Sequence, residues 1–315
     1  MEMERVPQAG YNIVGLPVRG FNRAQPWKNV SVLMDLFKSL KQVKRIIRDF
    51  RPDVGVGVGG YASGAAMWQA AKMGIPILLQ EQNGFAGVTN KILKDKAAKI
   101  CVAYEGMERF FPADKIILTG NPVRQNLLNG ERRKVKGERN LLIIGGSLGA
   151  RTINEAIKAA LPELAKSDLH IVWQTGKYYF ASCKAAWEAA GSPKNIECLD
   201  FLSDMPDRYA NADLVISRAG ASSISELCLL GKPAILVPSP NVAEDHQTHN
   251  AMALVRKDAA VLVKDSEAAD KLVSTALELI KDDAKLQSLH TNILTLAQTD
   301  SARRIAEEVI KLARN

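Results

Sequence analysis

Short apolar segments that run directly into a glycine- or serine-rich turn recur along this sequence, and they constrain its fold more than any other feature. The clearest is residues 212–217 (ADLVIS), which lead through Gly220 into the serines of Ala221–Glu226. A short, β-branched apolar run indicates a buried strand, and the glycine and serines indicate a turn and a helix start. Strands that alternate with helices form a parallel sheet covered on both faces. We therefore expect an α/β fold.

The same pattern recurs along the chain. Residues 53–60 (DVGVGVGG) and 141–150 (LLIIGGSLGA) each read as a strand that ends in glycines, and the second leads into a helix expected from Arg151 to Ala165. Helical periodicity predicts further helices at 31–48 and at about 300–313. Further strands are expected at 11–18, 75–79, 99–103, 115–118, 169–173, 195–198, 233–237 and 260–263.

A polar segment divides the chain into two parts of ordinary domain size. Residues 125–140 are charged and nearly free of large apolar side chains, as is typical of a domain boundary. We expect a first domain at 1–125, a second at 126–298, and a C-terminal helix at 299–315 that packs back on the first domain. Each domain would hold one parallel sheet, and the two sheets would face each other across a cleft.

The composition limits the classes of protein that need to be considered. The chain is 47% hydrophobic and 24% charged, which is typical of a folded globular protein. No apolar run approaches the roughly 20 residues that span a bilayer, and no signal peptide is recognisable. The four cysteines have no CxxC spacing, so we expect buried, reduced thiols. The sequence predicts a cytoplasmic protein.

The formal charge of +8 is concentrated near the start of the chain. Residues 19–51 carry nine basic and two acidic side chains, and the helix expected at 31–48 has basic residues opposite an apolar face. Such a helix can bind an anionic membrane surface, and a solvated crossover helix has the same pattern. The apolar positions are Leu33, Leu36, Phe37, Leu40, Val43 and Ile47, and the candidate membrane contacts in the preceding loop are Phe21, Arg23, Trp27 and Lys28.

The junction between a strand and a helix start can bind an anion or a nucleoside. Amides of the first helical turn have no partner within the helix and lie at the positive end of its dipole. The loop at 145–150 and the helix start after Gly220 are both of this kind, and the carboxylate of Glu226 can accept hydrogen bonds from a ribose diol. The loop at 145–150 lacks the Lys-Ser/Thr ending of a phosphate loop and the full dinucleotide glycine pattern, so ATP and NAD are not its obvious ligands. An ordinary strand–loop–helix connection has the same sequence features.

Two further clusters are candidates for a site. Glu81 and Asn83 follow the strand expected at 75–79, at the sheet edge where ligands bind in α/β folds. Asp245, His246 and His249 have a spacing that could be taken for metal ligands. Because they stand at a polar helix start, we expect hydrogen bonding or solvation there instead, and no metal.

Six ordered motifs carry a family resemblance: GVGGYASG, LQEQNGFAGVTN and GNPVR, then GGSLGARTIN, SRAGASSISE and DHQTHN. With them the chain resembles the MurG family of peptidoglycan glycosyltransferases over nearly its whole length. The resemblance implies the GT-B fold of two Rossmann-like domains. It implies inverting transfer of N-acetylglucosamine (GlcNAc) from UDP-GlcNAc to undecaprenyl-pyrophosphoryl-N-acetylmuramyl-pentapeptide, which converts lipid I to lipid II in peptidoglycan synthesis. It also implies a peripheral position on the cytoplasmic side of the membrane, cell-wall synthesis proteins as partners, and neither a cofactor nor nucleic acid.

The resemblance also implies roles for individual residues. Arg124 and Ser147 would contact the diphosphate, Glu226 the ribose, Leu202 the uracil, and Gln247 and Asn250 the sugar. Glu81 and Asn83 are the catalytic candidates, and the expected acceptor contacts are Gly59, Gly60, Tyr61 and Glu81. The expected donor contacts are Asn83, Arg124, Ser147, Leu202, Arg218, Ala221, Ser222, Ser223, Ile224, Ser225, Glu226, Gln247 and Asn250.

The sequence departs from the family pattern at two places. Gln80 stands where the family often has histidine, and the opening strand with its Gly-Gly-Thr-Gly-Gly-His loop is absent. We therefore expect the first domain to lack its initial βα unit, and with it a histidine that is a candidate general base. Two alternatives remain: a UDP-GlcNAc 2-epimerase, and a donor-binding chain with impaired catalysis.

Overall fold

The computed structural model describes residues 2–20, 29–133 and 137–314. The chain forms two compact units, each built on its own parallel sheet. The first unit comprises Met1–Glu81, Ala86–Leu118 and Arg303–Asn315, and the second comprises Gln82–Phe85 and Thr119–Ala302. The chain thus passes between the units after Glu81, Phe85, Leu118 and Ala302, whereas the sequence analysis placed the domain limits at 125 and 298.

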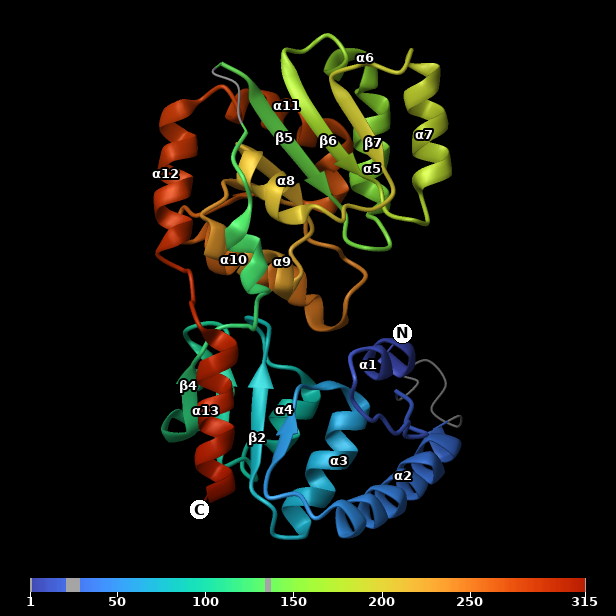
Figure 1. Cartoon of the computed structure of the whole chain (residues 1–315), viewed down its shortest axis with the longest axis vertical. Coiled ribbons are helices and arrows are strands. Elements are labelled where there is room, and N and C mark those ends of the chain that lie inside the picture. The colour runs from blue at the N-terminus through green and yellow to red at the C-terminus, as the bar shows by residue number, and fades with distance from the viewer. Residues whose placement is uncertain (1, 21–28, 134–136, 315) are drawn as a thin grey trace. The chain divides into compact units, whose positions relative to one another are not determined.

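The first unit holds a four-stranded parallel sheet in the order β1-β2-β3-β4. Helices α2 and α3 pack side by side (Figure 1), and Arg304 of α13 donates to the Leu118 carbonyl at the end of β4 (2.5 Å). Every residue of β2 is buried, so this strand forms the centre of the core. The elements are α1 (Glu2–Gln8), α2 (Asn29–Phe50), β1 (Gly55–Gly57), α3 (Gly60–Lys72), β2 (Ile77–Glu81), α4 (Val88–Leu93), β3 (Lys99–Val102), β4 (Ile116–Leu118) and α13 (Ser301–Arg314).

One prediction for the start of the first unit is wrong. Residues 11–18 form no strand, because they run beside α2 instead of pairing with a neighbour: Gln42 Nε2 donates to the Gly15 carbonyl (3.2 Å). The apolar positions named for α2 divide between core and surface: Val43 and Ile47 are buried, whereas Phe37 is 71% exposed and Leu33 is exposed too. Val32 and Ser39 complete the buried stripe.

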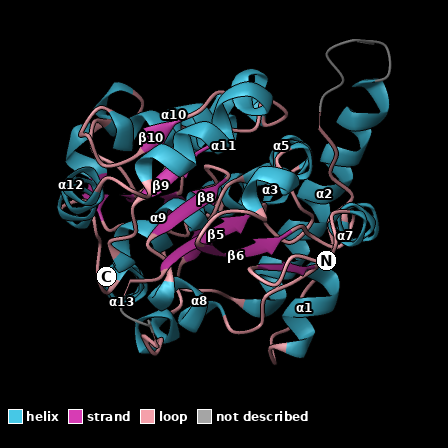
Figure 2. Cartoon of the chain, turned by 90° about the horizontal axis from the view of Figure 1, so that it is seen from above, coloured by secondary structure: helices cyan, strands magenta, loops and turns pink. Residues whose placement is uncertain are grey.

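The second unit holds a six-stranded parallel sheet in the order β10-β9-β8-β5-β6-β7. Figure 2 shows β10, β9, β8, β5 and β6 as successive strands with helices around them. The strands are β5 (Arg139–Ile144), β6 (Leu169–Gln174), β7 (Ile196–Leu199), β8 (Leu214–Ser217), β9 (Ala234–Leu236) and β10 (Val261–Leu262). The helices are α5 (Arg151–Ala159), α6 (Leu161–Leu164), α7 (Phe180–Ala189), α8 (Met205–Asn211), α9 (Ala221–Leu230), α10 (His246–Val255), α11 (Ala268–Leu279) and α12 (Asp283–Leu294).

The two central strands of the second unit are apolar where both faces of the sheet are covered: Leu141–Ile144 of β5 and Leu214–Ile216 of β8 are all buried. Leu141 and Ile143 of β5 belong to a core that also contains side chains of α5 and α11. Leu142 and Ile144, which point to the other face, are buried as well. The single helix expected at 151–165 is divided into α5 and α6, because Pro162 cannot continue the α5 hydrogen-bond ladder.

Two further expectations concern cysteines and membrane spans. In the described residues all four cysteines are free, and burial raises the pKa of the Cys198 and Cys228 thiols to about 12. Thiols with so high a pKa stay protonated and unreactive at neutral pH. No helix of the described residues combines the length and the apolar character that crossing a membrane requires.

One buried polar pair links α5 to the centre of the second sheet. Asn154 of α5 accepts a hydrogen bond from the indole of Trp173 (3.0 Å) and donates to the Thr175 carbonyl (2.8 Å). Trp173 is fully buried, and Asn154 is 1% exposed. Both partners of Asn154 therefore depend on this one side chain.

We expect Asn154→Ala to lower the melting temperature by about 4–8 °C, because it leaves a buried donor and a buried acceptor unsatisfied at a total cost of about 2 kcal/mol. The measurement is thermal unfolding followed by circular dichroism. The matched control is Asn292→Ala, which removes an exposed bond to the Asp258 carbonyl and should shift the melting temperature by less than about 2 °C. Equal shifts in the two variants would contradict the role given to Asn154.

Candidate functional site

The second sheet brings two loops together at the carboxyl ends of its central strands. β5 pairs in parallel with β8, with Ile144 opposite Ser217, so the loops that follow both strands leave the same edge. The strand order reverses direction here, since β6 lies on one side of β5 and β8 on the other. Such a switch point is where open α/β sheets bind ligands. A cavity of about 670 Å³ lies at this edge.

The glycine-rich loop after β5 forms one wall of the cavity. Gly146 and Gly149 have φ values of +81° and +88°, which side chains disfavour. A Cβ atom on Gly149 would also lie 2.1 Å from the Thr175 carbonyl oxygen, so this position is closed to larger residues. Ser147, which was expected to contact a diphosphate, is exposed on this loop.

A buried glutamine fixes the shape of this loop. Gln174, at the end of β6, donates to the carbonyls of Gly146 (2.9 Å) and Asp200 (3.2 Å) and accepts from the amide of Gly145 (3.2 Å). Leu202, the expected uracil contact, lies in the neighbouring loop with its side chain 4% exposed, so only its backbone could meet a ligand. Sequence reasoning missed Gln174, since a glutamine at a strand end carries no motif.

The opposite wall of the cavity is the start of α9. Gly220 caps the helix without a side-chain hydrogen bond, and Gly220 and Ser223 line the cavity. The amides of Ala221, Ser222 and Ser223 lie in the first helical turn, where no intrahelical acceptor exists. The positive end of the α9 dipole is therefore directed at the cavity.

Two residues expected at this helix start are engaged within the protein. The amide of Ile224 donates to the Gly220 carbonyl (3.0 Å), and its side chain is 1% exposed. The hydroxyl of Ser225 donates to the Ala221 carbonyl (2.9 Å) and accepts from Asn121 (3.0 Å). The amides of Ala221–Ser223 thus remain as the backbone donors of this stretch that have no intrahelical acceptor.

Arg218 contributes a cationic side chain to the cavity wall. Its guanidinium donates to the Val237 carbonyl (3.0 Å) and forms a short ion pair with Asp265. The other carboxylate oxygen of Asp265 accepts from Thr152 at the start of α5 (2.9 Å). These contacts join the two loops and hold the arginine in one orientation.

Glu226 lies on α9 three residues beyond Ser223, which places both on about the same face of the helix. Its Oε1 faces the Nη2 of Arg124 at 3.4 Å, and its Oε2 accepts a hydrogen bond from the Tyr209 hydroxyl (3.1 Å). Arg124 is largely exposed, with 63% of its side chain accessible, whereas Glu226 is 14% exposed. The structure therefore pairs two residues that the sequence predicted for one ligand, and adds Tyr209.

Gln247 and Asn250 are both on α10, but they are placed differently. Gln247 lines the cavity, and its Oε1 accepts from the amides of Ala219 (3.2 Å) and Ser239 (2.9 Å), which aligns the side chain with the cavity wall. Asn250 is fully buried. It accepts from the Gly84 amide (2.7 Å) and donates to Asn83 Oδ1 (3.1 Å), so it holds the segment Gln82–Phe85 within the second unit.

The residues expected to bind the acceptor substrate lie in the first unit, and residues at α4 form hydrogen bonds to two of them, Glu81 and Gly60. Glu81 is 2% exposed, and its Oε2 accepts from the Gly87 amide (3.0 Å) and from Asn90 (2.8 Å). The adjacent Thr89 donates to the Gly60 carbonyl (3.2 Å). Gly59 and Gly60 have φ values of +86° and +79° at the start of α3, followed by Tyr61, which is exposed.

The cluster of acidic and histidine side chains at 245–249 serves packing and hydrogen bonding. Within residues 2–20, 29–133 and 137–314, no three His, Cys, Asp or Glu side chains come together as a metal site. His249 instead stacks on Phe85, with ring centroids 4.6 Å apart, and Asp245 accepts from the Thr248 hydroxyl (2.7 Å). The membrane candidates Phe21, Arg23, Trp27 and Lys28 lie outside the described residues.

Comparison with known proteins shows the family to which the chain belongs. Residues 1–102 match the glycosyltransferase family 28 N-terminal domain, and residues 140–309 match the family 28 C-terminal domain. The chain belongs to glycosyltransferase family 28. A UDP-N-acetylglucosamine–N-acetylmuramyl-(pentapeptide) pyrophosphoryl-undecaprenol N-acetylglucosamine transferase of Bacteroides thetaiotaomicron is 58% identical over 99% of this chain and 87% of its own length.

Solved structures agree with this assignment. MurG from Acinetobacter baumannii superposes with a TM-score of 0.79 at 29% identity, covering 99% of this chain and 88% of that one. A putative UDP-N-acetylglucosamine 2-epimerase from Listeria monocytogenes has a TM-score of 0.62 at 12% identity, over 91% of this chain and 80% of its own, and shares the fold alone. The family resemblance, the GT-B fold and the glycosyltransferase class predicted from the sequence are confirmed. The role of each site residue stays a prediction.

We expect Asn250→Ala to loosen the segment Gln82–Phe85, because the Gly84 amide loses its buried acceptor. Hydrogen–deuterium exchange at Gly84 should become about tenfold faster or more, which corresponds to about 1.4 kcal/mol of lost protection. The control is Thr248→Ala on the same helix, which removes an exposed hydroxyl bond to Asp245 and leaves the contacts of Asn250 in place. Unchanged exchange at Gly84 in Asn250→Ala would show that other contacts hold the segment.

Proposed function

We propose that this chain transfers GlcNAc from UDP-GlcNAc to the hydroxyl of an undecaprenyl-pyrophosphoryl-linked N-acetylmuramyl-pentapeptide. The observation that carries the proposal is 58% identity, over 99% of the chain, to a transferase that is named for this activity. The site supports it, because the cavity at the β5–β8 edge offers helix-terminal amides and arginines to an anionic donor.

In this proposal the second unit binds the donor. The amides of Ala221–Ser223, Ser147 and Arg218 hold the diphosphate, and the carboxylate of Glu226 accepts hydrogen bonds from the ribose diol. Gln247 is aligned along the cavity wall to meet the sugar. Leu202 contributes its backbone to the uracil pocket.

The main chemical requirement of the reaction is that the negative charge on the leaving group be stabilised. As the acceptor hydroxyl attacks the anomeric carbon from the opposite side, the bond to UDP breaks and negative charge grows on the β-phosphate oxygen. The α9 dipole and its first-turn amides are fixed in place before that charge appears, so they stabilise the transition state without reorganising. Arg218 is likewise fixed in place, by its ion pair with Asp265 and its hydrogen bond to the Val237 carbonyl, and its positive charge stabilises the same negative charge.

The catalytic candidates are Glu81 and Asn83. The two hydrogen bonds to Glu81 Oε2 fix the orientation of that carboxylate, and a fixed carboxylate can accept the proton of the acceptor hydroxyl. Asn83 is aligned by Asn250. Gly59, Gly60 and Tyr61 form the proposed binding loop for the acceptor's pyrophosphate, at the start of α3.

The decisive experiment supplies labelled UDP-GlcNAc with and without a lipid-linked N-acetylmuramyl-pentapeptide. The proposal expects labelled lipid and free UDP only when the acceptor is present. Release of N-acetylmannosamine from the donor alone would instead identify an epimerase. Donor-dependent thermal stabilisation without product from any acceptor would identify a chain that binds but does not transfer.

We expect Glu226→Gln to raise the dissociation constant for UDP by about tenfold or more, because the amide has one acceptor oxygen in place of two and no charge. Isothermal titration calorimetry with UDP measures it. Glutamine still offers an oxygen to Tyr209, so the fold should be kept. The matched control is Glu278→Gln, on an exposed position of α11, which should bind UDP as the parent does. An unchanged affinity at Glu226→Gln would remove Glu226 from the proposed donor site.

The proposed location is the cytoplasmic side of the membrane, in peripheral contact with its anionic surface. α2 supports this, because Val30, Leu33, Met34 and Phe37 are exposed along one face of the helix. Helical periodicity places exposed Lys41, Lys44 and Arg48 further along that same face. The exposed apolar side chains can insert between lipid headgroups, and the basic side chains are attracted to headgroups that are anionic.

We expect Phe37→Ser to weaken binding to vesicles that contain anionic phospholipid by about fivefold or more, because it removes an apolar side chain from the membrane face. Vesicle co-sedimentation measures it. Phe50→Ser is the matched control: Phe50 is 78% exposed, but at the helix end and on the opposite side of α2. Equal weakening by both changes would contradict the proposed face.

A further inference from the structure

Tyr209 is a buried tyrosine whose hydroxyl reaches the donor side of the second unit. It is fully buried on α8, and its hydroxyl donates to Glu226 Oε2 (3.1 Å). The reaction proposed above does not use it. The hydroxyl of Tyr209 contacts the carboxylate of Glu226, which we propose as the ribose contact. The tyrosine ring is buried and cannot touch a ligand in the cavity. Any effect of Tyr209 on a ligand must therefore act through Glu226.

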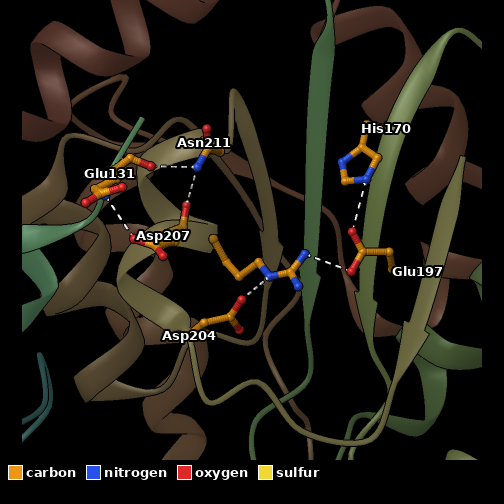
Figure 3. Close-up of polar contacts among 7 residues, drawn as sticks. Glu131, His170, Glu197, Asp204, Asp207 and Asn211 are labelled. Carbon is orange, nitrogen blue, oxygen red and sulfur yellow. Dashed lines mark hydrogen bonds and ion pairs between the residues drawn. The ribbon is translucent and has the colours of Figure 1, made fainter. Parts of the chain in front are cut away.

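Helix α8 is tied to the rest of the second unit from two sides, as Figure 3 shows. On one side Arg208 bridges Glu197 of β7 (2.9 Å) and Asp204 (2.8 Å). On the other side Asp207 accepts from the Glu131 amide (2.9 Å), and Asn211 donates to the Glu131 carbonyl (2.9 Å). α8 is only seven residues long, so these contacts fix the whole helix and the tyrosine ring that it buries.

The same contacts also fix the chain that carries Arg124. The short helix Gln125–Asn129 follows Arg124, packs against α8 and leads to Glu131. α8 therefore determines the position of both groups that contact the Glu226 carboxylate. The two contacts differ in kind, because Arg124 is largely exposed at 3.4 Å whereas the tyrosine hydroxyl is buried at 3.1 Å. An exposed long side chain restrains its partner weakly, so Tyr209 is the stronger restraint on the carboxylate.

The tyrosine stays a hydrogen-bond donor over the physiological pH range. Burial, and next the nearby Glu226 carboxylate, raise the pKa of Tyr209 well above its usual value. A protonated phenol donates to one carboxylate oxygen along a set direction, and such a charge-assisted bond is stronger than a neutral one. The remaining lone pairs of the carboxylate are then directed away from Tyr209.

We propose that Tyr209 is a positioning residue that sets the selectivity for ribonucleotides, by orienting the Glu226 carboxylate so that it accepts from both hydroxyls of the ribose. This inference rests on the proposed function, and specifically on Glu226 as the ribose contact. A 2′-deoxyribose offers one hydroxyl to this carboxylate and gains less from its orientation. Without the phenol hydroxyl the carboxylate can rotate, and the advantage of the diol is reduced.

The test is Tyr209→Phe, which removes one oxygen and keeps the buried ring. Calorimetry with UDP and with 2′-deoxy-UDP should show that the parent prefers UDP by about tenfold. In the variant we expect UDP binding to weaken about tenfold and 2′-deoxy-UDP binding to weaken less than about threefold, so that the preference falls. In turnover assays KM for UDP-GlcNAc should rise about tenfold, with kcat within about twofold of the parent.

Two controls separate positioning from general damage. Tyr11→Phe removes the same hydroxyl from an exposed tyrosine of the first unit and should leave both affinities unchanged. Tyr209→Phe introduced into Glu226→Gln should change UDP affinity by less than about threefold, because the carboxylate through which it acts is already gone.

The outcomes distinguish this inference from the proposed function. Equal weakening of UDP and 2′-deoxy-UDP in Tyr209→Phe, or a full additional loss in the double variant, would overturn the positioning role. A parent protein that binds both nucleotides equally would overturn it as well, because there is then no selectivity to set. A parent protein that binds neither nucleotide would instead overturn the proposed function itself.

Discussion

The parallel pairing of β5 with β8 is the interaction on which the candidate site depends. Because Ile144 lies opposite Ser217, both strands end at the same level, and the two loops that follow meet at one edge. A one-residue slip would turn every side chain of a strand to the other face of the sheet. The register also sets the separation of the glycine-rich loop from the start of α9.

Polar side chains then hold those loops in shape through hydrogen bonds and one ion pair. Gln174 spans three backbone groups around the glycine-rich loop, Gln247 holds two amides near α10, and Asp265 joins Arg218 to Thr152. Each such group is costly if left unpaired, so the arrangement with all of them satisfied is favoured over alternatives. A site fixed in this way loses little conformational freedom when it binds.

The sequence predicted the strands of the second unit well because their apolar runs and glycine turns are local signals. β5, β6, β7, β8, β9 and β10 all lie within or beside the expected ranges. It failed at residues 11–18, because neighbours that are distant in the sequence decide whether a segment pairs as a strand. Motifs indicated Arg124, Ser147, Arg218 and Glu226. They could not indicate Gln174 or Tyr209, whose roles come only from what lies next to them in space.

The segment Gln82–Phe85 has a consequence for how this protein can be divided. It follows β2 of the first unit in the chain, yet Asn250 and Asn121 hold its backbone as part of the second unit. A recombinant fragment that starts at Thr119 would keep these two asparagines and lose the peptide groups that they bind. The second unit is thus discontinuous in the sequence, and expressing it alone calls for grafting the four residues Gln82–Phe85 onto it.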